Sequence, residues 1–265
     1  MADAKMPFLS HLEELRTRLI RSFVAIGLGF LLTFNFSEPI LGFLKKPLTA
    51  NLVFQRTPPF LTWAQRTQSF ELVFLAPAEA FWMHLKIAFF SGLLLALPFV
   101  LYEIWKFVEP GLLSHEKRFA LPFLILGSLF FFFGLLFCFY VVLPFALNFL
   151  LTYKTQHLKP MISIGNYVDF TVKFLLAFGL VFELPLAIGV AARMNLVTPQ
   201  FLAKNRKYAI LINFTLAAIL TPTPDVFNQT LMALPMCLLY EIGILAAKVV
   251  ARKKKPVVEE AAEGA

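Results

Sequence analysis

Residues 119–151 read FALPFLILGSLFFFFGLLFCFYVVLPFALNFLL, a run of 33 residues without a single charged side chain. About 20 consecutive apolar residues are enough for a helix to cross the hydrocarbon core of a bilayer. A helix formed by this run would be about 50 Å long, because each residue adds about 1.5 Å. The stretch therefore predicts a membrane-spanning helix that tilts, bends at Pro122 or Pro144, or projects beyond the bilayer.

The composition of the whole chain also indicates a membrane protein. Of its 265 residues, 59% are hydrophobic and 15% are charged, and the mean hydropathy is +0.75; soluble domains have about 25% charged residues. These values exclude an ordinary soluble fold and a disordered chain. The net charge of +8 is more typical of basic cytoplasmic loops than of nucleic-acid binding, because no basic groove is interleaved with stacking aromatics. Cys138 and Cys237 lie in apolar runs and predict neither a disulfide framework nor a zinc site.

Further apolar runs predict an all-α integral membrane protein with six transmembrane helices. The fifth run has only 12 residues, about 18 Å of helix, so the last two spans form a short hairpin. Prolines within or at the edges of the spans favour bends and a curved bundle. The six expected spans are 19–36, 87–105, 119–151, 168–192, 209–220 and 226–247.

Positive charges predict the orientation of the chain. Lys and Arg cluster in the amino-terminal segment, in the second-to-third and fourth-to-fifth connections, and in the carboxyl-terminal tail. Short loops rich in Lys and Arg stay cytoplasmic, so both termini are expected on the cytoplasmic side. The expected parts are a cytoplasmic helix start at 1–18, a transmembrane domain at 19–247 with an outer loop at 37–86, and a disordered cytoplasmic tail at 248–265. The first span is not expected to be a cleaved signal, since no small-x-small site follows it.

No catalytic signature is found in the sequence. It contains no H-E-x-x-H, G-x-S-x-G or P-loop motif, so we do not expect the chain to be an enzyme or to bind a cofactor or a metal ion. Instead Glu183 lies near the middle of the fourth span, where an ionised side chain costs at least about 2.5 kcal/mol. It is interpreted as a contact for a polar group of another helix or as a protonatable transport site. The alternative is a neutral side chain bonded to a backbone carbonyl that Pro185 leaves free.

A second group of acids is expected on the cytoplasmic face. Ser10 and Glu13 have capping-box spacing, so a helix should begin there and continue into the first span. Glu14 and Arg18 are four residues apart, and an intrahelical pair is the simplest interpretation. Glu116 falls in the first turn of the third helix, where the helix dipole favours an acid. Two acids on a basic face would suit a guanidinium ligand, which binds carboxylates through two hydrogen bonds.

For three other acids, the sequence predicts either a structural role or no specific role. Asp225 follows Thr221-Pro222-Thr223-Pro224, and it most simply caps the sixth helix. Glu103 at the inner end of the second span and Glu241 in the sixth span predict no specific role.

Six motifs in order along the chain resemble the TatC family, the polytopic core of the Sec-independent twin-arginine protein translocase. They cover nearly the whole chain, which makes the resemblance specific. The motifs are SHLEELR (10–16), KPL (46–48), LAPAEAF (75–81), the stretch 98–118 with LYEIWKFVEPGLLSHEKR, AFGLVFELPL (177–186) and TPDVFNQTLMALPMCLLYEIG (223–243).

The resemblance implies a six-helix, cup-shaped bundle in the cell inner membrane that exports folded proteins. It implies binding of Arg-Arg signal peptides on the cytoplasmic face by Glu14 and Glu116, with Arg16, Phe107 and Arg118 as further candidates. Glu183 matches the family acid that faces single-span TatA/TatB-type partner subunits. Self-association in a larger complex is also implied. Pro47 and Asp225 match family positions that are important on the outer side.

Two functions of other classes remain as alternatives at this stage. One is a proton-coupled small-solute transporter that uses Glu183 as its titrating site, which inverted repeats would support. The other is a multispan scaffold without transport activity.

Overall fold

The computed structural model describes residues 8–54, 61–65, 72–109, 120–153, 160–221, 223 and 225–250, and helices dominate them. Helix α10 (Arg206–Leu220) has 15 residues, about 22 Å of helix, and corresponds to the predicted short span. The prediction of a helical membrane protein is confirmed, and six spans are consistent with these helices. Within the described residues, five helical segments are long and apolar enough to cross a membrane: His11–Phe34, Glu79–Val108, Pro122–Thr152, Ile164–Arg193 and Val226–Val250.

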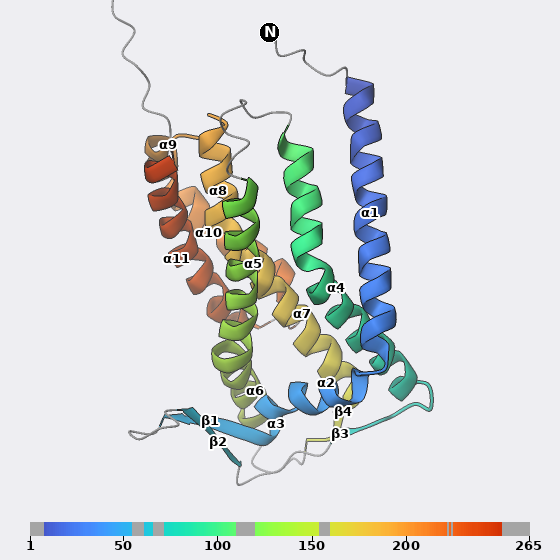
Figure 1. The fold of residues 1–265 in the computed structure, drawn as a ribbon. Helices are drawn as coiled ribbons and strands as arrows, with labels where there is room; N and C mark the ends of the chain where they lie inside the picture. Colours follow the sequence, from blue (N-terminus) through green and yellow to red (C-terminus); the bar gives the residue numbers. More distant parts are fainter. Residues whose placement is uncertain are drawn as a thin grey trace, which may run out of the picture.

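The first span is helix α1 (Phe8–Phe34), which packs against α4 (Glu79–Val108). Helix α1 begins two residues before Ser10, where a capping box was expected. Pro7 precedes its first residue in the sequence, and Pro is favoured at helix starts. Figure 1 shows α1 at one side of the bundle, beside α4. Only 11% of the most apolar 18-residue window of α1 is buried. Since the main neighbour of α1 is α4, the contact with α4 determines where α1 lies.

The apolar run quoted above forms two helices joined by an irregular turn. Helix α5 (Ala120–Phe137) leads into a π-helical turn at Cys138–Val142, and α6 (Leu143–Thr152) follows. Pro144 has no N–H to donate to the carbonyl of Tyr140, so a regular α-helix cannot continue through it. The expected bend therefore takes the form of a π turn just before Pro144.

The fourth predicted span is also broken, at Glu183. Helix α7 (Ile164–Phe182) ends immediately before this residue and α8 (Leu184–Arg193) begins after it, with Pro185 in its first turn. Asn195, after α8, has φ of 58°, a conformation that Asn tolerates better than most residues. Helix α9 (Pro199–Lys204) is capped by Thr198, which accepts a hydrogen bond from the N–H of Phe201. Helices α10 and α11 (Val226–Val250) are the last described elements.

Short elements gather at one end of the bundle, here called the hairpin end (Figure 1). They include the antiparallel pair of β1 (Ala50–Phe54) and β2 (Leu61–Gln65). The start of α1 and the end of α11 lie at the opposite end, here called the terminal end. The other short elements are α2 (Ser37–Leu44), α3 (Lys46–Thr49) and β3 (Leu72–Val73), which pairs in parallel with β4 (Ile162–Ser163).

Glu79 connects two parts of the hairpin end. It lies in the segment 37–86 that was predicted as the outer loop, yet it is the first residue of α4. Its carboxylate accepts the N–H of Leu75 at 2.6 Å and the N–H of Gly165 at 2.8 Å, and it accepts the hydroxyl of Ser163. One side chain thus joins the start of α4 to the start of α7.

The core lies among α4, α5, α7 and α11. Large side chains are fully buried in it, among them Phe174 and Phe178 of α7 and Ile87 of α4. Gly134 of α5 and Gly179 of α7 let these two helices approach closely, because a Cβ on Gly134 would lie 2.7 Å from the carbonyl oxygen of Phe178. This packed core supports the polar residues at the terminal end and at the α7–α8 break.

Candidate functional site

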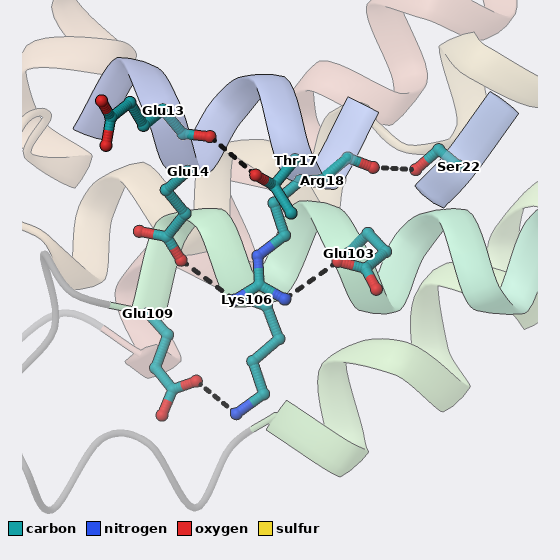
Figure 2. Close-up of polar contacts among 8 residues, drawn as sticks. All are labelled: Glu13, Glu14, Thr17, Arg18, Ser22, Glu103, Lys106 and Glu109. Atoms are coloured by element: carbon teal, nitrogen blue, oxygen red, sulfur yellow. Dashed lines mark hydrogen bonds and ion pairs between the residues drawn. The ribbon is translucent and has the colours of Figure 1, made fainter. Parts of the chain in front are cut away.

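Three side chains from α1 and α4 form an ion cluster at the terminal end (Figure 2). Arg18 Nη2 donates to Glu14 Oε1 at 3.0 Å, and Arg18 Nη1 donates to Glu103 Oε2 at 2.9 Å. Glu14 and Arg18 are one helical turn apart and therefore share a face of α1. That face meets α4, which supplies Glu103. We call Glu14, Arg18 and Glu103 the acid cluster.

The acid cluster is largely shielded from solvent. The side chain of Glu103 is 4% exposed, that of Glu14 19% and that of Arg18 21%. Charge–charge hydrogen bonds are stronger in such surroundings than in water, and a buried carboxylate needs a partner. Oε2 of Glu14 is buried and has no hydrogen-bond partner among the described residues. With two carboxylates and one guanidinium, the cluster carries a formal charge of about −1 at neutral pH.

Two more contacts lie beside the acid cluster. Lys106 of α4 donates to Glu109 at 2.8 Å, so this neighbouring cation already has an acid of its own (Figure 2). The ring of Phe107 stacks on His11 of α1, with 4.4 Å between the ring centroids. This stacking holds the first turns of α1 against the last turns of α4. Phe107, a predicted site residue, therefore lies close to the cluster.

The structure describes only one of the three other residues predicted to bind the signal peptide. Arg16 is exposed on α1. Glu116 and Arg118 lie outside the described residues. The expected intrahelical pair of Glu14 with Arg18 is present, but the sequence analysis gave no role to Glu103. The signal was available, because an acid near the end of a span needs a partner, and a cation on a neighbouring helix is the simplest one.

Glu183 lies at the α7–α8 break and faces α5. Its Oε2 is 3.5 Å from the position that a Cβ on Gly127 would occupy. Its Oε1 is buried and has no hydrogen-bond partner among the described residues. The buried hydroxyl of Ser128, the residue after Gly127 in α5, also lacks a partner among the described residues. Buried polar atoms without partners are costly, so a hydrogen-bond donor at Glu183 would be favourable.

Pro47 and Asp225, the two residues predicted to matter on the outer side, have structural roles: one is buried and the other caps a helix. Pro47 is buried in α3. Asp225 caps α11, because its Oδ1 accepts the N–H of Asn228 at 2.7 Å and its Oδ2 accepts the Asn228 side-chain amide at 2.9 Å. Partial burial alone would raise the pKa of Asp225, but these hydrogen bonds and one to Thr223 outweigh burial and lower the pKa below its ordinary value.

A large apolar cavity near the terminal end is separate from the acid cluster. It has a volume of about 430 Å³ and lies among α4, α5, α8 and α11, where Trp105 and Phe123 line it. Trp105 and Glu103 are two residues apart, about 200° around α4, so the cavity and the cluster lie on different faces of this helix. Among the described residues, no group of three or more His, Cys, Asp or Glu side chains could hold a metal ion.

The fold and the acid cluster together define a class, a polytopic membrane protein with a guanidinium-binding acidic cluster at one end of its helices. The family model described as "Sec-independent protein translocase protein (TatC)" matches residues 10–235. The chain therefore belongs to the TatC family of Sec-independent protein translocase proteins.

Individual relatives agree with this assignment over nearly their full length. The chain is 44% identical over 261 residues to the TatC protein of Desulforapulum autotrophicum, covering 98% of this chain and 91% of the relative. It is 39% identical over 254 residues to that of Aquifex aeolicus, covering 95% and 99%. A crystal structure of the twin-arginine translocase receptor TatC superposes with a TM-score of 0.75 at 38% identity, covering 91% of this chain and all of that one.

Proposed function

We propose that the chain is the receptor of a twin-arginine translocase and binds Arg-Arg signal peptides at the terminal end. Glu14 accepts one arginine of the signal, and Glu116 accepts the other. The observation that carries the proposal is the guanidinium of Arg18, which lies between two carboxylates of α1 and α4. A cluster that already coordinates one guanidinium and keeps a carboxylate oxygen without a partner has the chemistry to coordinate a second.

The proposal includes an orientation in the inner membrane. The terminal end is cytoplasmic, so both termini and the acid cluster face the compartment from which folded precursors come. The distribution of Lys and Arg supports this orientation, because short basic loops stay in the cytoplasm. The hairpin end, with its short helices and strands, then covers the outer side.

Glu183 is proposed as the contact for single-span partner subunits of the TatA/TatB type. Its position at a helix break, with a buried carboxylate oxygen that has no hydrogen-bond partner among the described residues, supports this role. A polar side chain of a partner helix could donate a hydrogen bond to this oxygen, which would offset the cost of leaving it in an apolar environment. The assembled complex also contains further copies of this chain.

Binding of a signal peptide to the purified full chain tests the proposal. A fluorescent peptide with an Arg-Arg motif is titrated against the wild type, Glu14→Gln, Glu116→Gln and the double variant. Each single variant should lose affinity about tenfold or more, because a hydrogen bond to a charged group contributes about 1.5 to 3 kcal/mol.

The control variant is Glu241→Gln. Glu241 also binds an arginine through two hydrogen bonds, to Arg206 at 2.7 Å and 2.9 Å, but it lies on α11, away from the acid cluster. The affinity of the Glu241→Gln variant for the peptide should equal that of the wild type. Wild-type affinity in the Glu14→Gln/Glu116→Gln variant would exclude the proposed site.

A further inference from the structure

We infer that Arg18 is an internal substitute for the signal arginine, and that Glu103 takes over Arg18 when a signal peptide occupies Glu14. The inference rests on the proposed function, since it describes how the same site is emptied and filled. It adds Glu103 as a positioning residue, which acts on the signal peptide through Arg18.

The geometry of Arg18 supports this exchange. Its two terminal nitrogens bind separate carboxylates, Glu14 on its own helix and Glu103 on α4, at nearly equal distances of 3.0 Å and 2.9 Å. Arg18 can therefore release Glu14 without losing its other acid. A small rotation of the guanidinium towards Glu103 turns a shared arginine into a simple ion pair.

The two acids differ in burial, and the difference fixes which one keeps Arg18. The side chain of Glu103 is 4% exposed, whereas that of Glu14 is 19% exposed. A carboxylate that is almost completely buried is destabilised without a partner more strongly than a partly exposed one. Arg18 should therefore remain with Glu103, and the more accessible Glu14 becomes available to the peptide.

Charge balance gives the same result. The resting cluster has two carboxylates and one guanidinium, so it can accept one further positive charge and become neutral. In the occupied state the signal arginine pairs with Glu14 and Arg18 pairs with Glu103. Lys106 does not disturb this count, because it is paired with Glu109 at 2.8 Å (Figure 2).

Without Glu103 the exchange would fail. Arg18 would then have only Glu14 as its counter-charge. An incoming signal arginine would have to displace Arg18 from Glu14 or share the Glu14 carboxylate with Arg18. Two guanidinium groups on one carboxylate repel each other, and the displaced Arg18 would lie in a partly buried place without a counter-charge. Glu103 is thus expected to control the affinity for the signal peptide through Arg18.

Variants of the purified full chain test the inference with the same Arg-Arg peptide. Glu103→Gln should bind about tenfold more weakly than the wild type, because Arg18 then occupies Glu14. Glu103→Asp keeps the carboxylate and should retain most of the affinity. Arg18→Gln should bind several-fold more tightly, since the signal arginine can then reach both acids.

The double variant Arg18→Gln/Glu103→Gln is decisive. It removes both the competing arginine and the acid that holds it, and it leaves no buried charge unpaired, so it should fold and bind within about threefold of the wild type. A merely structural role for the pair would instead weaken binding in every variant. The inference is overturned if Glu103→Gln binds like the wild type, if Arg18→Gln loses affinity, or if the double variant binds no better than Glu103→Gln.

The proposed function and the inference can fail separately. If Glu14→Gln keeps wild-type affinity, the proposed site itself is wrong. If Glu14→Gln loses affinity but the double variant is not restored, the site stands and only the exchange of Arg18 is wrong. Glu241→Gln again serves as the control for loss of an unrelated arginine–carboxylate pair.

Discussion

Replacing Gly29 by Ala should separate α1 from α4. The two helices cross at Gly29 and Gly92, where their backbones touch. A Cβ on Gly29 would lie 2.5 Å from the carbonyl oxygen of Gly92 and 3.0 Å from its Cα. These are backbone atoms and cannot rotate away, so the helices must move apart by about 1 Å to regain ordinary contact.

The cost of this separation can be set from general overpacking data. Insertion of a methyl group into a tight contact costs about 1–3 kcal/mol. The hydrogen bond from Thr33 Oγ1 to the carbonyl of Ala88 crosses the same contact at 2.8 Å and should lengthen as well. Because α1 packs mainly on α4, the displacement should extend to the acid cluster and weaken the pairing of Arg18 with Glu103.

Gly27→Ala is the matched control on the same helix. Nothing lies within 4 Å of a Cβ at Gly27, so this variant adds the same methyl group in open space. Thermal unfolding of the purified protein should show a fall of several degrees in Tm for Gly29→Ala and none for Gly27→Ala. Signal-peptide affinity should fall only for Gly29→Ala. Equal Tm values for the two variants would refute the packing argument.

Two further predictions concern Glu183 and Asp225. Glu183→Ala should not lower the Tm of the isolated chain, because it removes a buried oxygen without a described partner. The same variant should no longer co-purify with single-span subunits. A destabilised chain that still assembles with these subunits would contradict the proposed role of Glu183. The lowered pKa of Asp225 contributes stability above the ordinary aspartate range of about 4, and this stability is lost as the pH falls below it. Thermal unfolding between pH 7 and pH 3 should therefore decline less in Asp225→Asn than in the wild type, and parallel declines would show that the cap does not titrate.

Single motifs predict parts of the polar structure. An acid in the middle of an apolar run makes Glu183 conspicuous, and its functional role stays a prediction. The cap expected at Asp225 after Thr-Pro-Thr-Pro is confirmed by its hydrogen bonds to Asn228. The π turn at 138–142 was harder to foresee. Pro144 announces an interruption of the helix, but neighbouring helices decide whether it becomes a kink or an inserted residue.

The sequence by itself determined the membrane class, the approximate spans and the family, because the length and apolarity of a run are local properties of the chain. Only the tertiary structure decided which acid meets which base. Arg18 and Glu103 are 85 residues apart, and their pairing depends on how closely α1 approaches α4 at Gly29 and Gly92. An ion pair between two helices follows from their crossing point and rotation, and neither is encoded in the segment that carries either charge.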